Sequence, residues 1–214
     1  MLPGIGSRPL YRGVSHRFAF YAAVLACPLL VALADHAAAR ACAAVYGTCL
    51  ATMFGVSATL HRADWSPRVY SWLRRADHAA IFVCIAGTYT PFSLLGIGGE
   101  DGRQLVVIAW AVCGAGVLRA LLWPHAPRAL TASCFVAAGW VVVAYLPELR
   151  TATDAFTFAS IAVGGVLFTI GAIIYIVRWP DPSPRVFGYH EVFHVLVIVA
   201  CAWHFTAVAR LVGR

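Results

Sequence analysis

The sequence contains no lysine and no asparagine, and charged residues make up only 12% of its 214 positions. A soluble globular domain carries about 25% charged residues. So few charges would leave the surface of a water-soluble protein of this size largely apolar. Hydrophobic residues reach 61%, which excludes a disordered chain as well as an ordinary soluble enzyme. The composition therefore predicts an integral membrane protein.

Paired cysteines are also absent, because the seven cysteines occur singly inside apolar runs. This pattern is typical of small packing residues rather than of disulfides or a thiolate metal site. All sixteen basic side chains are arginine, and the formal net charge is +7. The arginines lie between apolar runs instead of along one helix face or in a tail. We therefore expect membrane lipid, and no nucleic acid, as the partner.

Seven apolar runs approach the length of about 20 helical residues that crosses a bilayer. They are continuous rather than alternating, which favours helices over a β-barrel. We expect an all-α membrane bundle of seven transmembrane helices over 18–210, between an N-terminal segment 1–17 and a tail 211–214. The first run is long for the core of a cleaved signal peptide, so we expect it to remain as a helix. The runs span 18–34, 41–60, 78–98, 104–122, 129–147, 155–177 and 187–209.

The arginines favour one orientation of this bundle. With a cytoplasmic N-terminus, eleven of the sixteen arginines fall on the cytoplasmic side and five on the opposite side. The positive-inside rule therefore predicts that the N-terminus is cytoplasmic and the C-terminus outside. We expect a multi-pass protein of a bacterial inner (plasma) membrane.

Several ionisable residues lie in or beside the runs, where lipid makes them unfavourable and function is the first hypothesis. His190 and His194 are four residues apart and share one helix face; a hydrogen-bonded pair facing the bundle is the alternative to a metal site. His61 ends the second run and Asp77 opens the third, so all four residues fall at the same end of the bundle. Three histidines, a carboxylate and a water suit a catalytic Zn²⁺. Ser57, one turn before His61, can hydrogen-bond a ligand or that water.

The stretches SATLH, LRRADHAAIFVCIAGTYTPF and HEVFHVLVIVACAWHF resemble the haemolysin III family, which is related to the adiponectin and progestin receptors and, more distantly, to the alkaline ceramidases. The resemblance covers about residues 12–210. Its specific part is Ser-x3-His, an aspartate about sixteen residues later, and a C-terminal His-x3-His. The resemblance implies a seven-helix fold in which His61, His190 and His194 bind zinc on the cytoplasmic side. It also implies that Asp77 contacts the zinc through water.

Other polar residues have different expected roles. Many family members carry an acidic residue and an asparagine before the first helix, and the segment YRGVSHRF has neither, so we expect His16 to be interfacial. The sequence HEVFH also matches the zincin motif, in which Glu191 would be the general base. We expect instead that Glu191 reaches the interface or pairs with Arg185. His204 lies about 15 Å beyond His194 along the helix, so we expect it to hydrogen-bond within the bundle.

The predicted site favours a zinc-dependent membrane hydrolase of lipid amides or esters, similar to a ceramidase. Bound zinc lowers the pKa of its water to about 7, and Asp77 can pass a proton from that water to a leaving amine. Two other functions remain open: a non-enzymatic signalling or sensing protein with structural zinc, and the cytolytic protein that the family name suggests. A chain whose helices are apolar throughout argues against a secreted pore former.

Overall fold

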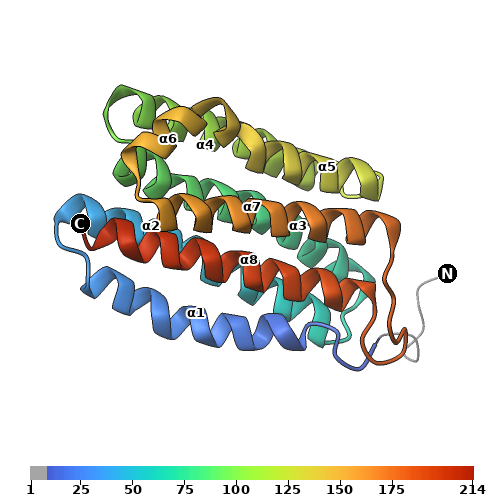
Figure 1. The fold of residues 1–214 in the computed structure, drawn as a ribbon. Helices are drawn as coiled ribbons and strands as arrows, with labels where there is room; N and C mark the ends of the chain where they lie inside the picture. The colour runs from blue at the N-terminus through green and yellow to red at the C-terminus, as the bar shows by residue number, and fades with distance from the viewer. Residues whose placement is uncertain (1–8) are drawn as a thin grey trace.

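A computed structural model describes residues 9–214, so part of the predicted N-terminal segment lies outside the described residues. Within this range, seven helical segments are long and apolar enough to cross a membrane, which confirms the predicted all-α fold. Figure 1 shows them side by side along a common direction. They are α1 (Val14–Ala32), α2 (Ala37–Arg62), α3 (Pro67–Pro91) continued by the π-helical η1 (Phe92–Ile97), α4 (Gly99–Leu122), α5 (Arg128–Gly139) continued by the 3₁₀-helical η2 (Trp140–Tyr145) and α6 (Leu146–Ala152), α7 (Ala155–Val177) and α8 (Tyr189–Val212).

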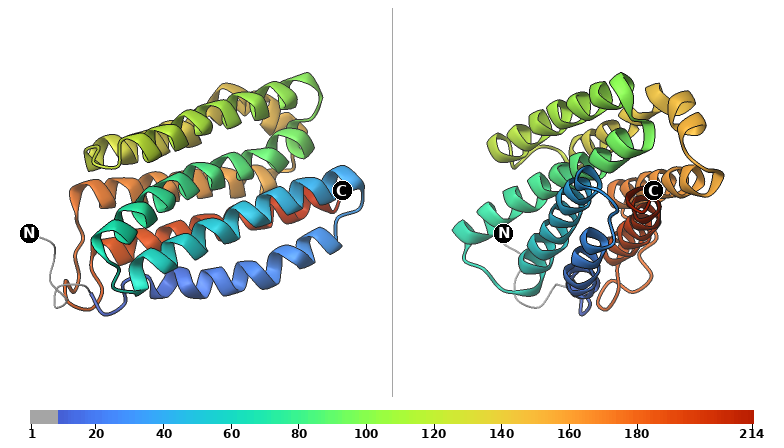
Figure 2. Two further views of the ribbon diagram at one scale, coloured as in Figure 1. Left: turned by 180° about the vertical axis from the view of Figure 1, so that it is seen from behind. Right: turned by 90° about the vertical axis from the view of Figure 1, so that its left-hand side faces the viewer.

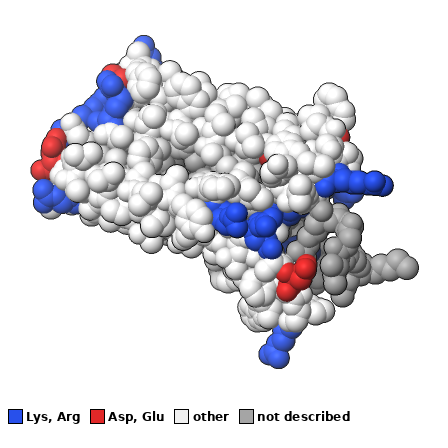
Figure 3. Space-filling view, turned by 90° about the horizontal axis from the view of Figure 1, so that it is seen from below, with Lys and Arg blue, Asp and Glu red and all other residues white. Residues whose placement is uncertain are grey.

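The C-terminal helix α8 lies inside the bundle, where it contacts α1, α2, α3 and α7. Figure 2 shows α4 and the α5–α6 segment stacked outside this group. Large apolar side chains of α4, such as Val107 and Leu118, are exposed. Figure 3 shows charged side chains gathered toward the two ends, with uncharged surface between them. An apolar belt between charged ends is the surface that a bilayer requires.

Short polar signals set the helix ends more accurately than hydropathy does. Ser66 accepts a hydrogen bond from the Val69 amide and Pro67 occupies the first turn, so α3 begins at Pro67 rather than at 78. Its first turns are rich in arginine, which hid them from a search for apolar residues. In the same way, the Asp154 carboxylate accepts the amides of Phe156 and Thr157 and begins α7.

The fifth span is interrupted, which the sequence did not predict. The Tyr89 hydroxyl of α3 donates to the Gly139 carbonyl at 2.7 Å and accepts the Val142 amide at 2.9 Å. A side chain inserted into the helical ladder is a recognised cause of a break. Here the inserted hydroxyl replaces the hydrogen bonds lost where α5 gives way to η2.

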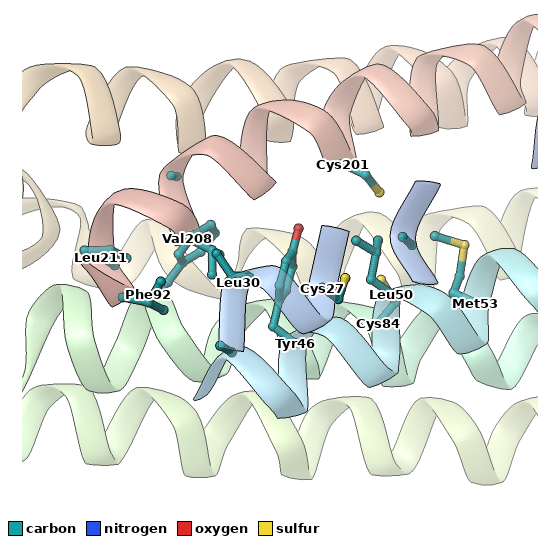
Figure 4. Packing of buried hydrophobic residues seen from close by; sticks show 14 of the residues in the cluster. Cys27, Leu30, Tyr46, Leu50, Met53, Cys84, Phe92, Cys201, Val208 and Leu211 are labelled. Atoms are coloured by element: carbon teal, nitrogen blue, oxygen red, sulfur yellow. The ribbon is translucent and has the colours of Figure 1, made fainter. Parts of the chain in front are cut away.

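The core lies between α1, α2, α3 and α8. Figure 4 shows Tyr46, Cys27 and Leu50 filling the space between these helices. The seven cysteines are free and six are buried, as expected for packing residues. This core holds α2, α3 and α8 in the register that positions the predicted site.

Candidate metal centre

Three histidines from two helices converge at one end of the bundle. His61 lies in the last turn of α2, while His190 and His194 lie in the first two turns of α8. One ring nitrogen from each lies within 4.8 Å of the other two. The ring centroids are 4.9 Å apart for His61 and His190, and 4.4 Å apart for His190 and His194. The structure therefore brings together the three histidines that the sequence singled out, in a group that could hold a metal ion.

Two nitrogens in this group need a partner. His190 Nε2 and His194 Nδ1 are buried, and neither has a hydrogen-bond partner among residues 9–214. A buried polar atom without a partner is unfavourable by about 1–3 kcal/mol in proteins. A neutral imidazole nitrogen with a free lone pair is the donor that zinc and similar ions bind. The donor set therefore fits an imidazole-binding metal.

The helix ends explain how the histidines reach one level. Helix α2 runs to Arg62, beyond its predicted end at 60, and α8 begins at Tyr189 rather than at 187. With a rise of about 1.5 Å per residue, His194 lies only about 7.5 Å below the start of α8. Together, these two differences from the predicted helix ends bring His61 to the same level as His190 and His194.

Ser57 and Asp77 lie next to the histidines. Ser57 is buried one turn before His61, and its hydroxyl lies 2.9 Å from His16 Nδ1. Asp77 of α3 lies close to Ser57. Asp77 is not part of the three-histidine group, and its contact with a metal through water stays a prediction.

The interpretation of His16 as an interfacial residue is wrong. His16 is 3% exposed, and its ring stacks on that of His194 with centroids 3.7 Å apart and planes 3° apart. Helix α1 begins at Val14, so His16 lies inside its first turn and faces the bundle. A signal was present in the sequence, because His16 shares the helical stripe of Ala23 and Cys27, both buried.

The predicted partner of Glu191 is also wrong. Glu191 is 1% exposed, and its Oε1 lies 2.5 Å from Nε of Arg12, not near Arg185. Its Oε2 accepts the Gly188 amide at 2.8 Å and so caps α8. Both oxygens of the carboxylate are engaged at the helix start, which argues against a role as the zincin general base.

The segment before α1 packs directly on the site. Gly13 has φ of 73°, and a Cβ atom there would lie 2.6 Å from the Cβ of His61. Only glycine suits both the backbone conformation and this close approach. The Leu10 amide donates to the Arg185 carbonyl, which ties the segment to the loop before α8. The N-terminal segment therefore packs on the Cβ and backbone of His61, which remains half-buried.

His204 is separate from the metal centre, as predicted. Its Nε2 lies 3.1 Å from the Ile161 carbonyl oxygen of α7. His78 follows Asp77 but packs its ring against Phe135 at 6.1 Å. Neither residue belongs to the three-histidine group, which makes both useful as controls.

A family model described as Haemolysin-III related matches residues 6–205. The chain belongs to the haemolysin-III-related family. It is similar to Hemolysin-3 of Bacillus cereus, with 28% identity over 87% of this chain and 84% of the relative. It is also similar to the heptahelical transmembrane protein ADIPOR2 of Oryza sativa subsp. japonica, with 31% identity over 78% of each chain. The human monocyte to macrophage differentiation factor is 22% identical over 94% of this chain and 82% of the relative. This haemolysin-III-related chain is a multi-pass integral membrane protein with bacterial homologues.

Proposed function

We propose that this haemolysin-III-related protein is a zinc-dependent membrane hydrolase that cleaves lipid amides or esters at the cytoplasmic leaflet. The observation that carries the proposal is the convergence of His61, His190 and His194, beside Asp77 and Ser57, at one end of a membrane bundle. Amide and ester carbonyls of membrane lipids lie near the headgroups, which is the depth expected for a site at the end of the bundle. The excess of arginine, eleven of sixteen, at the end of the bundle that carries the site supports the cytoplasmic placement.

In this proposal His61, His190 and His194 hold the zinc. Bound zinc supplies Lewis-acid polarisation of a carbonyl and activation of water near neutral pH. Asp77 accepts the proton of the attacking water and returns it to the leaving amine or alcohol. The Ser57 hydroxyl lies 2.9 Å from His16 Nδ1 and adjoins Asp77; in this proposal it orients the Asp77 carboxylate while the proton moves.

A structural metal in a non-enzymatic signalling or sensing protein is the second candidate. The packing of Gly13 on the Cβ and backbone of His61 favours it, because a site hemmed in by the chain on one side resembles closed coordination. The two candidates share the metal and differ in turnover. They are therefore separated by activity of protein whose metal content is known.

The test uses purified, zinc-quantified protein in nanodiscs that contain ceramide or phospholipid, with released fatty acid measured by mass spectrometry. We expect the Asp77→Asn variant to keep its metal and lose activity about 100-fold or more, because it lacks the proton carrier. The His78→Gln variant, with a change one residue away, should stay near the unmodified rate. Zinc-loaded protein that releases nothing from amides or esters would favour a structural metal. Liposome leakage that persists after substitution of all four of His61, Asp77, His190 and His194 would instead identify direct cytolysis.

A further inference from the structure

Four arginines gather where α3, α4 and α5 meet, at the end of the bundle that carries the metal centre. Arg74 and Arg75 belong to α3, Arg119 lies in the last turn of α4, and Arg128 is the first residue of α5. All four are half-buried rather than fully exposed. None takes part in the metal centre, and the proposed hydrolysis does not use them.

Specific contacts hold these side chains at the junction. Arg75 Nη1 donates to the Leu121 carbonyl at 2.5 Å, and Arg119 Nη1 donates to the Thr131 hydroxyl at 3.0 Å. The Arg128 guanidinium lies over the Tyr175 ring, 5.7 Å from its centroid. Contacts from α4, α5 and α7 therefore fix the guanidinium groups of Arg75, Arg119 and Arg128, which do not extend freely into solvent.

Several donors of these fixed groups are unused. Nε of Arg75, Nε and Nη2 of Arg119 and Nε of Arg128 are buried without a hydrogen-bond partner in the described range 9–214. Among residues 9–214, no carboxylate lies within 4.0 Å of any of the four guanidinium groups. Other arginines form ion pairs, which use Glu100, Asp154 and Glu191. A buried N–H donor without a hydrogen-bond partner is unfavourable. The junction therefore offers several donors that an anion with several acceptor oxygens would satisfy.

The surroundings identify the source of that anion. Trp72 of α3 and Trp123, directly after α4, are exposed beside the arginines, and the Arg75 guanidinium lies over the Trp72 ring at 5.0 Å. Exposed tryptophans mark the level of the lipid headgroups. Basic pockets between transmembrane helices at this level bind phosphate-bearing lipids. Guanidinium groups match the phosphate geometry with paired hydrogen bonds.

We propose that Arg74, Arg75, Arg119 and Arg128 form a binding site for the phosphate group of an anionic membrane lipid, between α3, α4 and α5. The site holds the headgroup while the acyl chains lie along the apolar outer faces of α4 and α5. It is distinct from the three-histidine group, and it requires neither bound metal nor turnover.

The experiment compares dioleoyl phosphatidic acid with dioleoylglycerol, which has the same acyl chains and lacks the phosphate. Protein in neutral detergent with excess EDTA, which prevents phosphate from binding a metal, is titrated with each lipid. Bound lipid is counted by native mass spectrometry and thermal unfolding is followed by tryptophan fluorescence. The test variant replaces Arg75, Arg119 and Arg128 with glutamine. The matched control removes the same charge from exposed positions at the same end by replacing Arg17, Arg68 and Arg178 with glutamine.

We expect the unmodified protein to bind phosphatidic acid at least about tenfold more tightly than dioleoylglycerol, because of the charge-assisted hydrogen bonds. The test variant should lose this preference about tenfold or more, and the control should keep it within about threefold. Inorganic phosphate alone, titrated in parallel, identifies the source. If inorganic phosphate binds as tightly as phosphatidic acid, the site is supported with free phosphate as its ligand. If inorganic phosphate binds much more weakly, the site is supported with the lipid as its ligand.

Two results would overturn the proposal. The first is equal affinity of the unmodified protein for the two lipids, which needs no variant and so remains decisive even if the test variant fails to fold. The second is an equal loss of preference in the test and control variants, which would reduce the effect to the overall charge of this end.

Discussion

His16 provides the sharpest test of how the metal centre is built, because a single substitution separates its two contacts. Its ring stacks on His194 at 3.7 Å, and its Nδ1 lies 2.9 Å from the Ser57 hydroxyl. Phenylalanine keeps a flat ring for the stack and removes the hydrogen bond. Loss of a hydrogen-bond partner of a metal ligand typically weakens metal affinity 10–100-fold, which is about 1.4–2.7 kcal/mol. The His16 hydrogen bond goes to Ser57 rather than to a ligand, so the effect should lie at the lower end of this range. We expect the His16→Phe variant to bind zinc about tenfold more weakly, and the His16→Ala variant to bind it more weakly still.

The assay measures zinc affinity of detergent-purified protein by competition with a chromophoric chelator. A double-mutant cycle of His16→Phe with Ser57→Ala should show a coupling of about 1 kcal/mol or more, because the two side chains act through one hydrogen bond. The His78→Phe variant controls for loss of an imidazole nearby. Unchanged affinity in His16→Phe, or strict additivity in the cycle, would refute the positioning role of His16.

Three further predictions concern the fold. The Tyr89→Phe variant should lose about 1–3 kcal/mol of stability in mixed-micelle unfolding, because the break after α5 loses its hydroxyl partner; unchanged stability would exclude this explanation of the break. The Arg12→Ala variant leaves the Glu191 carboxylate buried without its counter-charge and should lose about 1–3 kcal/mol of stability. This loss is smaller than for a fully buried pair because Arg12 is 21% exposed. The Arg185→Ala variant should stay within about 0.5 kcal/mol of the unmodified stability. Capping hydrogen bonds from Thr157 and the charges of Arg210 and Arg214 hold the pKa of Asp154 well below its usual range. Its contribution to stability is therefore complete above the ordinary carboxyl pKa and is lost as the pH falls below that value. The difference in the free energy of unfolding between the unmodified protein and Asp154→Ala should therefore shrink in acid, and a difference that grew in acid would contradict the assignment.

The number and type of the spans could be predicted from the sequence because apolar length alone decides them. Helix ends were less predictable, since caps such as Ser66 begin a helix in polar sequence that hydropathy excludes. The interruption after Gly139 depends on Tyr89, fifty residues earlier in the chain. Such long-range hydrogen bonds leave no periodic signal near the segment that they change.

Some residues of the candidate site could likewise be predicted from the sequence, and others could not. His61, His190 and His194 were found because their spacing and the alternating direction of the helices place them at one end. His16 was missed because the apolar run was taken to begin after it. The partner of Glu191 was missed because Arg12 lies on a segment whose path over the bundle is set by tertiary contacts.

Metal content is the most direct test of the central claim. We would determine zinc by elemental analysis of detergent-purified protein, of the His190→Ala/His194→Ala variant, and of a His78→Ala/His204→Ala variant that removes two histidines from outside the group. We predict about one zinc per chain in the unmodified protein and in the control, and none in the site variant. A chain that stays folded and metal-free after zinc is supplied would contradict it, and would reduce the three histidines to a polar packing network.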